Sequence, residues 1–246
     1  MKMTKTVIFS LATFATVTLG GAPVFAATAG VMNSNTDIIF QAETSITDPT
    51  NPLIPGAPVT PNPSDPHEPG TAGPLSIDYV SNFHFGTATI DDMDKIYYAQ
   101  LDSVVDKTTG LPLQVPNYVQ VTDKRGNNAG WKLLVKQNGQ FKTTDTNTTP
   151  LDNAQLHLSA GTPLSVVPIL FSPTTTAVNL DPTGAASSTV MTAVANKGFG
   201  TWTSSFGADN VGGLTGVSLN IPMASSKVSN VQYKTTLTWN LEDSPN

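Results

Sequence analysis

The stretch from Val231 to Leu241, VQYKTTLTWNL, alternates between two sets of side chains over its whole length. Successive side chains of a strand point to opposite faces, so every second residue from Val231 lies on a largely apolar face and the polar residues lie on the other. The pattern predicts a strand with one face against the protein and one face in water. A Trp-x-Leu couplet joins Trp239 to Leu241 on the apolar face, and the same couplet occurs at Trp131 and Leu133.

From residue 75 onward the chain repeats this kind of pattern in short runs separated by Gly, Pro, Asn and Asp. The clearest runs are 75–80, 94–105, 116–121, 130–135, 154–158, 163–170, 199–206, 215–221 and 231–241. Ile90, Met93 and Tyr97 favour one helical turn at most, and no stretch carries an apolar helical stripe over three turns. Many short strands with regular turn signals predict an all-β fold. We expect an antiparallel β-sandwich formed by residues 75–246, with a barrel as the alternative.

The first 26 residues have the order of a secretory signal peptide. Lys2 and Lys5 precede an uncharged apolar run over residues 7–19, and small residues follow up to Ala26. This order predicts export, with cleavage after Ala26 or else after Ala29. The apolar run is too short for a spanning helix. No other segment approaches the ~20 apolar residues that a span needs, so no membrane span is expected after cleavage.

Two further segments precede the predicted domain. The N-terminal segment, residues 27–47, contains a short strand candidate at 36–43, which we expect to pair with the main domain because an isolated strand is not stable. Residues 48–74 carry nine of the chain's 19 prolines. Proline fixes φ and removes backbone donors, so this stretch predicts an extended linker of up to ~80 Å. It would serve either as a stalk or as a solvated connection without a specific role.

Charge and composition narrow the range of partners. The formal net charge is −6, and it becomes −8 when the predicted signal peptide removes two lysines and no acid. Nucleic acid is therefore not expected as a partner, and binding to an anionic envelope would depend on shape and hydrogen bonding. The chain has no cysteine, so the exported protein depends on a core rather than on disulfides.

Four sequence blocks occur in a fixed order along the chain. They are residues 75–86 (LSIDYVSNFHFG), 121–126 with 130–133 (VTDKRG and GWKL), 217–222 (VSLNIP) and 237–241 (LTWNL). One Trp-x-Leu carries little information, but two copies with an Asp-Lys-Arg-Gly turn before the first and Leu-Thr before the second are more specific. The set resembles the WxL domain family of surface proteins from Gram-positive bacteria, over nearly the whole chain after the predicted cleavage point.

The resemblance implies noncovalent attachment to the outside of the cell wall through peptidoglycan, often together with other surface proteins. The pentapeptide LDPTG at residues 180–184 is superficially similar to a sortase signal, but its second residue is Asp and it is internal. We expect it to form a turn. The protein is thus expected to be secreted, extracellular and wall-associated, without a covalent anchor.

The candidate ligand-binding residues are those of the two couplets, Trp131, Leu133, Trp239 and Leu241. They either form the core or touch the ligand directly, and the regular inward face predicts that Trp239 is well buried. Arg125 follows Asp123 in a tight turn closed by Gly126. It offers a polar contact to a carboxylate such as that of a peptide stem, or else it pairs with Asp123.

Signals for catalysis or metal binding are poor. The three histidines do not fall in a nucleophile motif, and the Gly-x-Ser-x-Gly elbow is missing. Asp91, Asp92 and Asp94 lack the spacing of a calcium loop. We therefore predict no enzyme, no cofactor and no metal. The alternative to a peptidoglycan-binding module is a surface interaction protein, an adhesin or complex component, whose partner is another envelope or host protein bound along a sheet edge or through residues 36–43.

Overall fold

The computed structural model describes residues 30–243, and the predicted signal peptide at residues 1–26 lies outside the described residues. The chain divides into two units, residues 1–40 and residues 41–246. In the first unit, residues 30–40 form no regular element and are exposed. The second unit contains all the strands described below. Within residues 30–243 the structure contains no helix that is long and apolar enough to cross a membrane.

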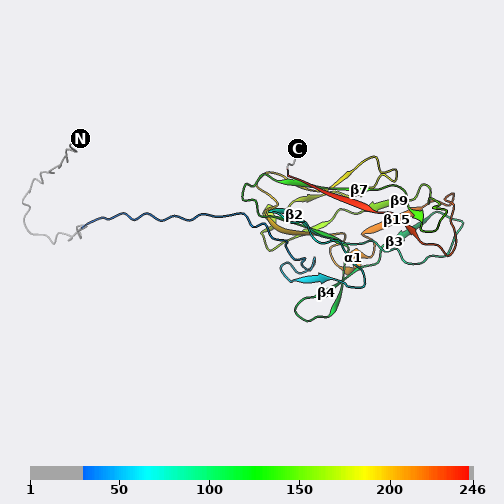
Figure 1. Cartoon of the computed structure of the whole chain (residues 1–246), viewed down its shortest axis with the longest axis horizontal. Coiled ribbons are helices and arrows are strands. Elements are labelled where there is room, and N and C mark those ends of the chain that lie inside the picture. The colour runs from blue at the N-terminus through cyan, green and yellow to red at the C-terminus, as the bar shows by residue number, and fades with distance from the viewer. Residues whose placement is uncertain (1–29, 244–246) are drawn as a thin grey trace, which may run out of the picture. The chain divides into compact units, whose positions relative to one another are not determined.

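The described part of the second unit, residues 41–243, contains seventeen short strands and almost no helix. Figure 1 draws the strands as arrows. The strands are β1 (Val59–Pro61), β2 (Leu75–Val80), β3 (Lys95–Tyr98), β4 (Asp102–Asp106), β5 (Pro112–Val115), β6 (Tyr118–Asp123), β7 (Trp131–Gln137), β8 (Lys142–Thr143), β9 (Gln155–Leu158), β10 (Thr162–Leu164), β11 (Thr174–Thr175), β12 (Val178–Asn179), β13 (Ser188–Ala193), β14 (Gly200–Ser205), β15 (Val217–Ile221), β16 (Tyr233–Lys234) and β17 (Leu237–Glu242). One helical turn, α1 (Asn210–Gly213), is capped by Asp209, whose carboxylate accepts from the Gly212 amide. A 3-10 turn covers Ile169–Phe171.

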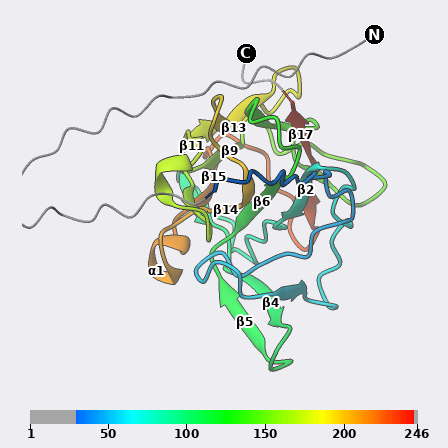
Figure 2. The ribbon, with the colours of Figure 1, turned by 90° about the vertical axis from the view of Figure 1, so that its left-hand side faces the viewer.

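All strand pairs are antiparallel, which confirms the predicted all-β antiparallel class. Three sheets have four strands each, in the orders β10-β14-β6-β2, β11-β13-β7-β17 and β12-β9-β15-β3. Smaller sheets are formed by β1-β4-β5 and by β16-β8. Figure 2 shows β4 and β5 projecting away from the other labelled strands.

One apolar core joins the three four-stranded sheets. Val121 of β6, Leu133 of β7 and Leu158 of β9 are fully buried in it. A second, smaller core lies on the other face of β6, where Tyr118 packs with Val59 and Val104. All six residues of β6 are therefore buried. Its polar residues face protein rather than water, unlike those of a strand with one wet face.

The prediction that residues 48–74 form an extended linker is wrong. Val59 is 1% exposed, β1 pairs with β4, and Asn51 and Pro52 are buried. Proline is tolerated here because β1 is the edge strand of its sheet and needs ladder hydrogen bonds on one side only. The segment covers the second face of β6 and belongs to the folded unit.

The prediction of a strand at residues 36–43 is also wrong. These residues have no strand pairing, and the side chains of Ile38, Ile39 and Phe40 are 75–84% exposed. The helical turn predicted near Ile90 is absent as well, since residues 90–94 are irregular and β3 begins at Lys95. The turn predicted at residues 180–184 is confirmed, because the Asp181 carboxylate accepts from the Thr183 amide at 2.9 Å and the Asp181 carbonyl from the Gly184 amide at 3.1 Å.

Candidate functional site

The two Trp-x-Leu couplets lie on adjacent strands of one sheet. In the register of β7 and β17, Leu133 is opposite Leu241 and Val135 is opposite Trp239. The sequence prediction that both couplets occupy strands of one β body is confirmed. Their environments nevertheless differ, because β7 is flanked by β13 and β17 whereas β17 is at the edge of the sheet.

The first couplet is part of the core. Trp131 and Leu133 are both 0% exposed, and the Trp131 indole Nε1 donates to the Gly198 carbonyl at 3.0 Å. A Cβ built on Gly198 would lie 2.7 Å from that nitrogen, so only glycine allows the indole to approach this closely. A ligand cannot reach the first couplet while the sheet is intact.

The second couplet borders the solvent. Trp239 and Leu241 pack against the main core but are only partly buried, while Asn240 between them is exposed. The prediction that Trp239 is well buried is therefore wrong. The reason is its position on an edge strand, which has no neighbour to cover its outer side.

Trp239 lines a groove of about 310 Å³, which we call the aromatic groove. Its apolar wall includes Phe83, Phe85, Phe141, Leu156, Leu237 and Trp239. Its polar lining includes His67, Glu68, Asn82, Thr235 and Thr236. An apolar wall with a few polar groups at its rim is the usual composition of a small-molecule site, and the volume is at the lower end of the range for such sites.

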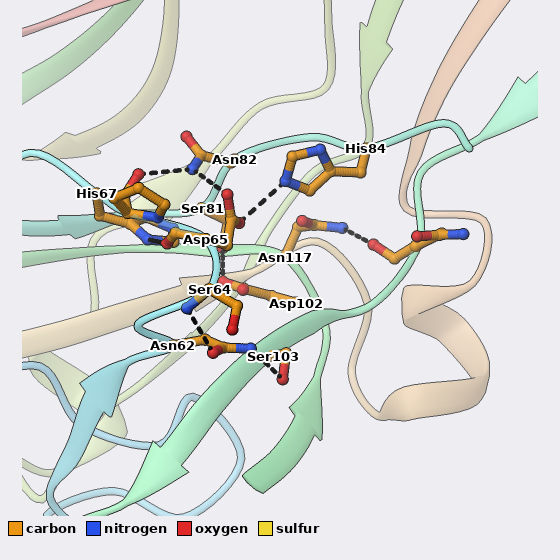
Figure 3. A network of polar contacts seen from close by, with 12 residues as sticks. Asn62, Ser64, Asp65, His67, Ser81, Asn82, His84, Asp102, Ser103 and Asn117 are labelled. Carbon is orange, nitrogen blue, oxygen red and sulfur yellow. Dashed lines mark hydrogen bonds and ion pairs between the residues drawn. The ribbon is translucent and has the colours of Figure 1, made fainter. Parts of the chain in front are cut away.

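A polar network adjoins one end of the aromatic groove (Figure 3). Its central acids are Asp65, from the proline-rich segment, and Asp102, at the start of β4. Asp102 accepts from the Tyr79 hydroxyl at 2.8 Å and from the Ser81 hydroxyl at 2.5 Å. The Asp65 carboxylate lies 2.9 Å from His84 Nε2, within hydrogen-bond distance. The network fixes the proline-rich segment to the loop that carries Phe83 and Phe85.

Electrostatics within this network stabilise the Asp65 carboxylate. Burial alone would raise the pKa of Asp65, but hydrogen bonds from His84 and Asn82 outweigh it and hold the pKa below its ordinary value. The Tyr79 pKa is raised, first by burial and then by the Asp102 charge. Tyr79 therefore stays protonated and acts as a hydrogen-bond donor.

Within residues 30–243, the cluster with the geometry of a possible metal site consists of Asp65, His67 and Asp102, whose ligand atoms lie within 4.8 Å of one another. Each group is already engaged by the protein: His67 Nε2 lies 3.0 Å from the Tyr79 hydroxyl and its Nδ1 lies 2.7 Å from the Asp65 carbonyl. A cation would have to displace these contacts. Asp65 and His67 are two positions apart, but Asp102 lies far from both in the sequence, so the spacing of the three residues gave no signal.

Two of the three aspartates considered from the sequence, Asp91 and Asp94, have other partners. Asp91 pairs with Lys95 at 2.8 Å, and Asp94 accepts from the Met223 amide at 2.8 Å. Neither belongs to the Asp65 cluster.

Arg125 is occupied by the protein itself. Its guanidinium donates to both oxygens of Asp123, at 3.0 and 2.8 Å, and also to the Gly130 and Asp243 carbonyls. The Asp123 carboxylate raises the pKa of Arg125 further, against a smaller opposing effect of burial. The side chain ties the β6–β7 turn to the end of β17, which supports the alternative in which Arg125 pairs with Asp123.

Sequence reasoning missed most of the groove. Phe83 and Phe85 belong to the first sequence block. The sequence therefore singled them out, but it could not show that they line a groove. Phe141 and Glu68 carried no signal, because the chain returns to the groove from distant segments. Asn82 likewise gains its role only from the pairing of the 81–84 loop with the proline-rich segment.

Comparisons with known proteins bear on what this groove does. The family model described as WxL domain, surface cell wall-binding, matches residues 27–245. A search of curated proteins finds no match, and neither does a search of solved structures.

Proposed function

Since the chain belongs to the WxL family of surface cell wall-binding domains, we propose that it attaches noncovalently to peptidoglycan through the aromatic groove. The partly exposed indole of Trp239 is the observation that carries this proposal. An indole with one free side can stack on a pyranose ring, while polar groups at the rim donate to its hydroxyls. Trp131 supports the fold instead.

The charge of the protein favours this mode of binding over electrostatic attraction. The acidic chain is repelled by anionic wall polymers, so recognition has to come from stacking and hydrogen bonds. Asn82, Thr235 and Thr236 offer neutral donors and acceptors along the groove. Arg125 is engaged with Asp123 and is not proposed as a contact to a stem-peptide carboxylate.

The remaining parts of the proposal concern export and architecture. We propose that residues 1–26 direct secretion, which agrees with a family match that begins at residue 27. The architecture proposed is a sandwich, with sheet β11-β13-β7-β17 in one layer and the two other four-stranded sheets in the second. The core cluster that contains Trp131, Val121 and Leu158 supports this arrangement, because it draws residues from all three sheets.

The proposed role is non-catalytic. The Ser81 hydroxyl donates to Asp102 rather than to a histidine, so it lacks the base that activates a nucleophilic serine. His157 contacts the Asn179 side chain at 2.7 Å. Incubation with isolated sacculi is expected to release no soluble muropeptides.

Tryptophan fluorescence tests the groove directly. The chain has three tryptophans, of which Trp131 and Trp202 are 0% exposed. A soluble peptidoglycan fragment that enters the groove should therefore change the emission through Trp239, saturably, and the change should be absent in Trp239→Phe. Saturable binding with unchanged emission in the wild type would place the ligand elsewhere.

A second candidate function rests on the exposed apolar side chains of Ile38, Ile39 and Phe40. An extended apolar segment can add as a strand to the sheet edge of another surface protein. In that case, capture of a partner would survive digestion of peptidoglycan and would be lost on Ile39→Asp. Binding that disappears with peptidoglycan would exclude this role.

A further inference from the structure

A second buried cluster, outside the aromatic groove, joins the proline-rich segment to β6. There the Thr50 hydroxyl donates to Oε1 of Gln120 at 3.1 Å, and the Thr50 backbone amide donates to the same oxygen at 2.7 Å. The two donors draw electron density from the amide carbon, and the Thr50 backbone amide can keep its hydrogen bond to the oxygen while the hydroxyl attacks. The Thr50 hydroxyl is thus held beside the Gln120 side-chain amide, and the backbone amide of Thr50 polarises that same group.

A buried acid touches the other end of the same amide. Asp78 Oδ2 accepts from Gln120 Nε2 at 2.9 Å, and also from the Thr122 hydroxyl at 2.5 Å. Asp78 is 3% exposed, and none of the ion pairs among residues 30–243 includes it. Burial raises the pKa of this carboxyl and outweighs the hydrogen bonds from Ser76, Thr122 and Gln120.

The backbone is shaped to bring this acid to the amide. The pairing of β2 with β6 shifts register between Ile77 and Tyr79, so Asp78 is the extra residue of a β-bulge. A bulge re-aims a side chain at the cost of regular pairing. Here the bulge directs the Asp78 carboxyl, which has no ion-pair partner in the described part of the chain, toward the side-chain amide of Gln120.

We propose that Thr50 and Gln120 form an intramolecular ester, with Asp78 as the proton-transfer group. The Thr50 Oγ1–Gln120 Cδ bond forms and the Cδ–Nε2 bond breaks. As this bond forms, the Thr50 hydroxyl passes its proton to Gln120 Oε1, the atom that it already contacts. Asp78 gives a proton to Nε2, which leaves as ammonia, and the proton on Oε1 returns to Asp78 through the departing ammonia as the ester carbonyl forms again. The step needs no oxidant and no co-reactant, because the only products are the ester and ammonia.

Burial makes such a link durable. Gln120 is 0% exposed and Thr122 is 1% exposed, so water has little access to the ester carbonyl. Thr50 is partly exposed, which leaves ammonia a way out. The link would close a loop of about 70 residues in a chain that has no cysteine, and would fix the proline-rich segment covalently to the sheet.

The intact mass of the purified, folded full chain tests the proposal. The wild type should be lighter than its sequence by one ammonia, counted from the N-terminus found by fragmentation. Digestion should yield one branched peptide containing Thr50 and Gln120, which hydroxylamine separates under denaturing conditions. Thr50→Ser should retain the deficit, whereas Thr50→Val and Asp78→Asn should show the full mass.

A matched control comes from Asn138 and Thr238, which form a hydroxyl–amide pair at 3.1 Å on the surface. No carboxylate is hydrogen-bonded to this pair, so the two residues should remain unlinked, and Thr238→Val should keep the deficit of the wild type.

A folded wild type at full mass overturns the proposal. A deficit that persists in Thr50→Val also overturns it, because the ammonia was then lost elsewhere. Wall binding is unaffected by either result, since neither Thr50 nor Gln120 lines the aromatic groove.

Discussion

Two tryptophans in the same three-residue motif have different roles, and their neighbours decide which. Trp131 lies on an inner strand, is 0% exposed and bonds to Gly198. Trp239 lies on an edge strand and borders a groove. The alternation of side chains predicted the face of each indole correctly. It could not predict exposure, because exposure depends on which strand ends the sheet.

Truncation of Trp131 should cost stability. Trp131→Ala leaves a cavity and an unpaired Gly198 carbonyl, so we expect a loss of about 3–5 kcal/mol in the free energy of unfolding. Urea unfolding followed by circular dichroism measures it. Lys132→Ala, on the partly exposed face of the same strand, should cost less than about 1 kcal/mol. Equal losses in the two variants would contradict the assignment of Trp131 to the core.

The Asp65 carboxylate should make stability depend on acidity. Its pKa in the folded state lies below the ordinary value of 3.8, so the folded state favours the charged form. This contribution is present above the unfolded-state pKa and is lost as the pH falls through the folded-state pKa. The wild type should therefore lose more stability than Asp65→Asn between pH 5 and pH 3, as measured by urea midpoints. Parallel pH profiles of the two proteins would show that the contacts from His84 and Asn82 have no such effect.

At the scale of elements, the proline-rich segment differs most from its prediction. Proline density predicted an extended spacer, since proline removes backbone donors. An edge strand such as β1 tolerates this loss, however, and Val59 supplies an apolar anchor. The strands with one wet face, such as β7 and β17, were predictable from alternation. Strand β13 was not, because STVMTA does not alternate clearly.

Most of the candidate site was beyond sequence reasoning for a related reason. Phe83 and Phe85 stood out in the sequence, but their meeting with Trp239 depends on sheet order. Asp65 and Asp102 meet only because the proline-rich segment folds back onto the domain. Pairing over such distances leaves no periodic signal.

Removal of residues 30–40 tests the boundary of the folded unit. These residues are exposed and irregular, so their deletion should change the free energy of unfolding by no more than about 0.5 kcal/mol. Val59→Ala, within the proline-rich segment, should instead lower it by about 2 kcal/mol because Val59 is buried. A stable Val59→Ala variant would restore the spacer interpretation.

At the scale of the whole molecule, an acidic all-β domain of the WxL family has to bind a wall that bulk charge does not favour. The structure offers a groove in which a partly exposed indole and neutral polar groups lie together. It also offers a sheet edge at β17, which borders that groove. A partner strand added along the β17 edge would therefore compete with wall binding for the same side of the molecule.

Sedimentation with isolated sacculi, comparing Trp239→Ala with Asn240→Ala, tests the central claim most directly. Both substitutions lie on β17, but Trp239 faces the groove and Asn240 is exposed on the opposite face. Loss of a stacking contact worth about 1 kcal/mol predicts that Trp239→Ala binds roughly five- to tenfold more weakly while it remains folded. Asn240→Ala should bind like the wild type. Undiminished binding by a folded Trp239→Ala variant would contradict recognition of the wall through the aromatic groove.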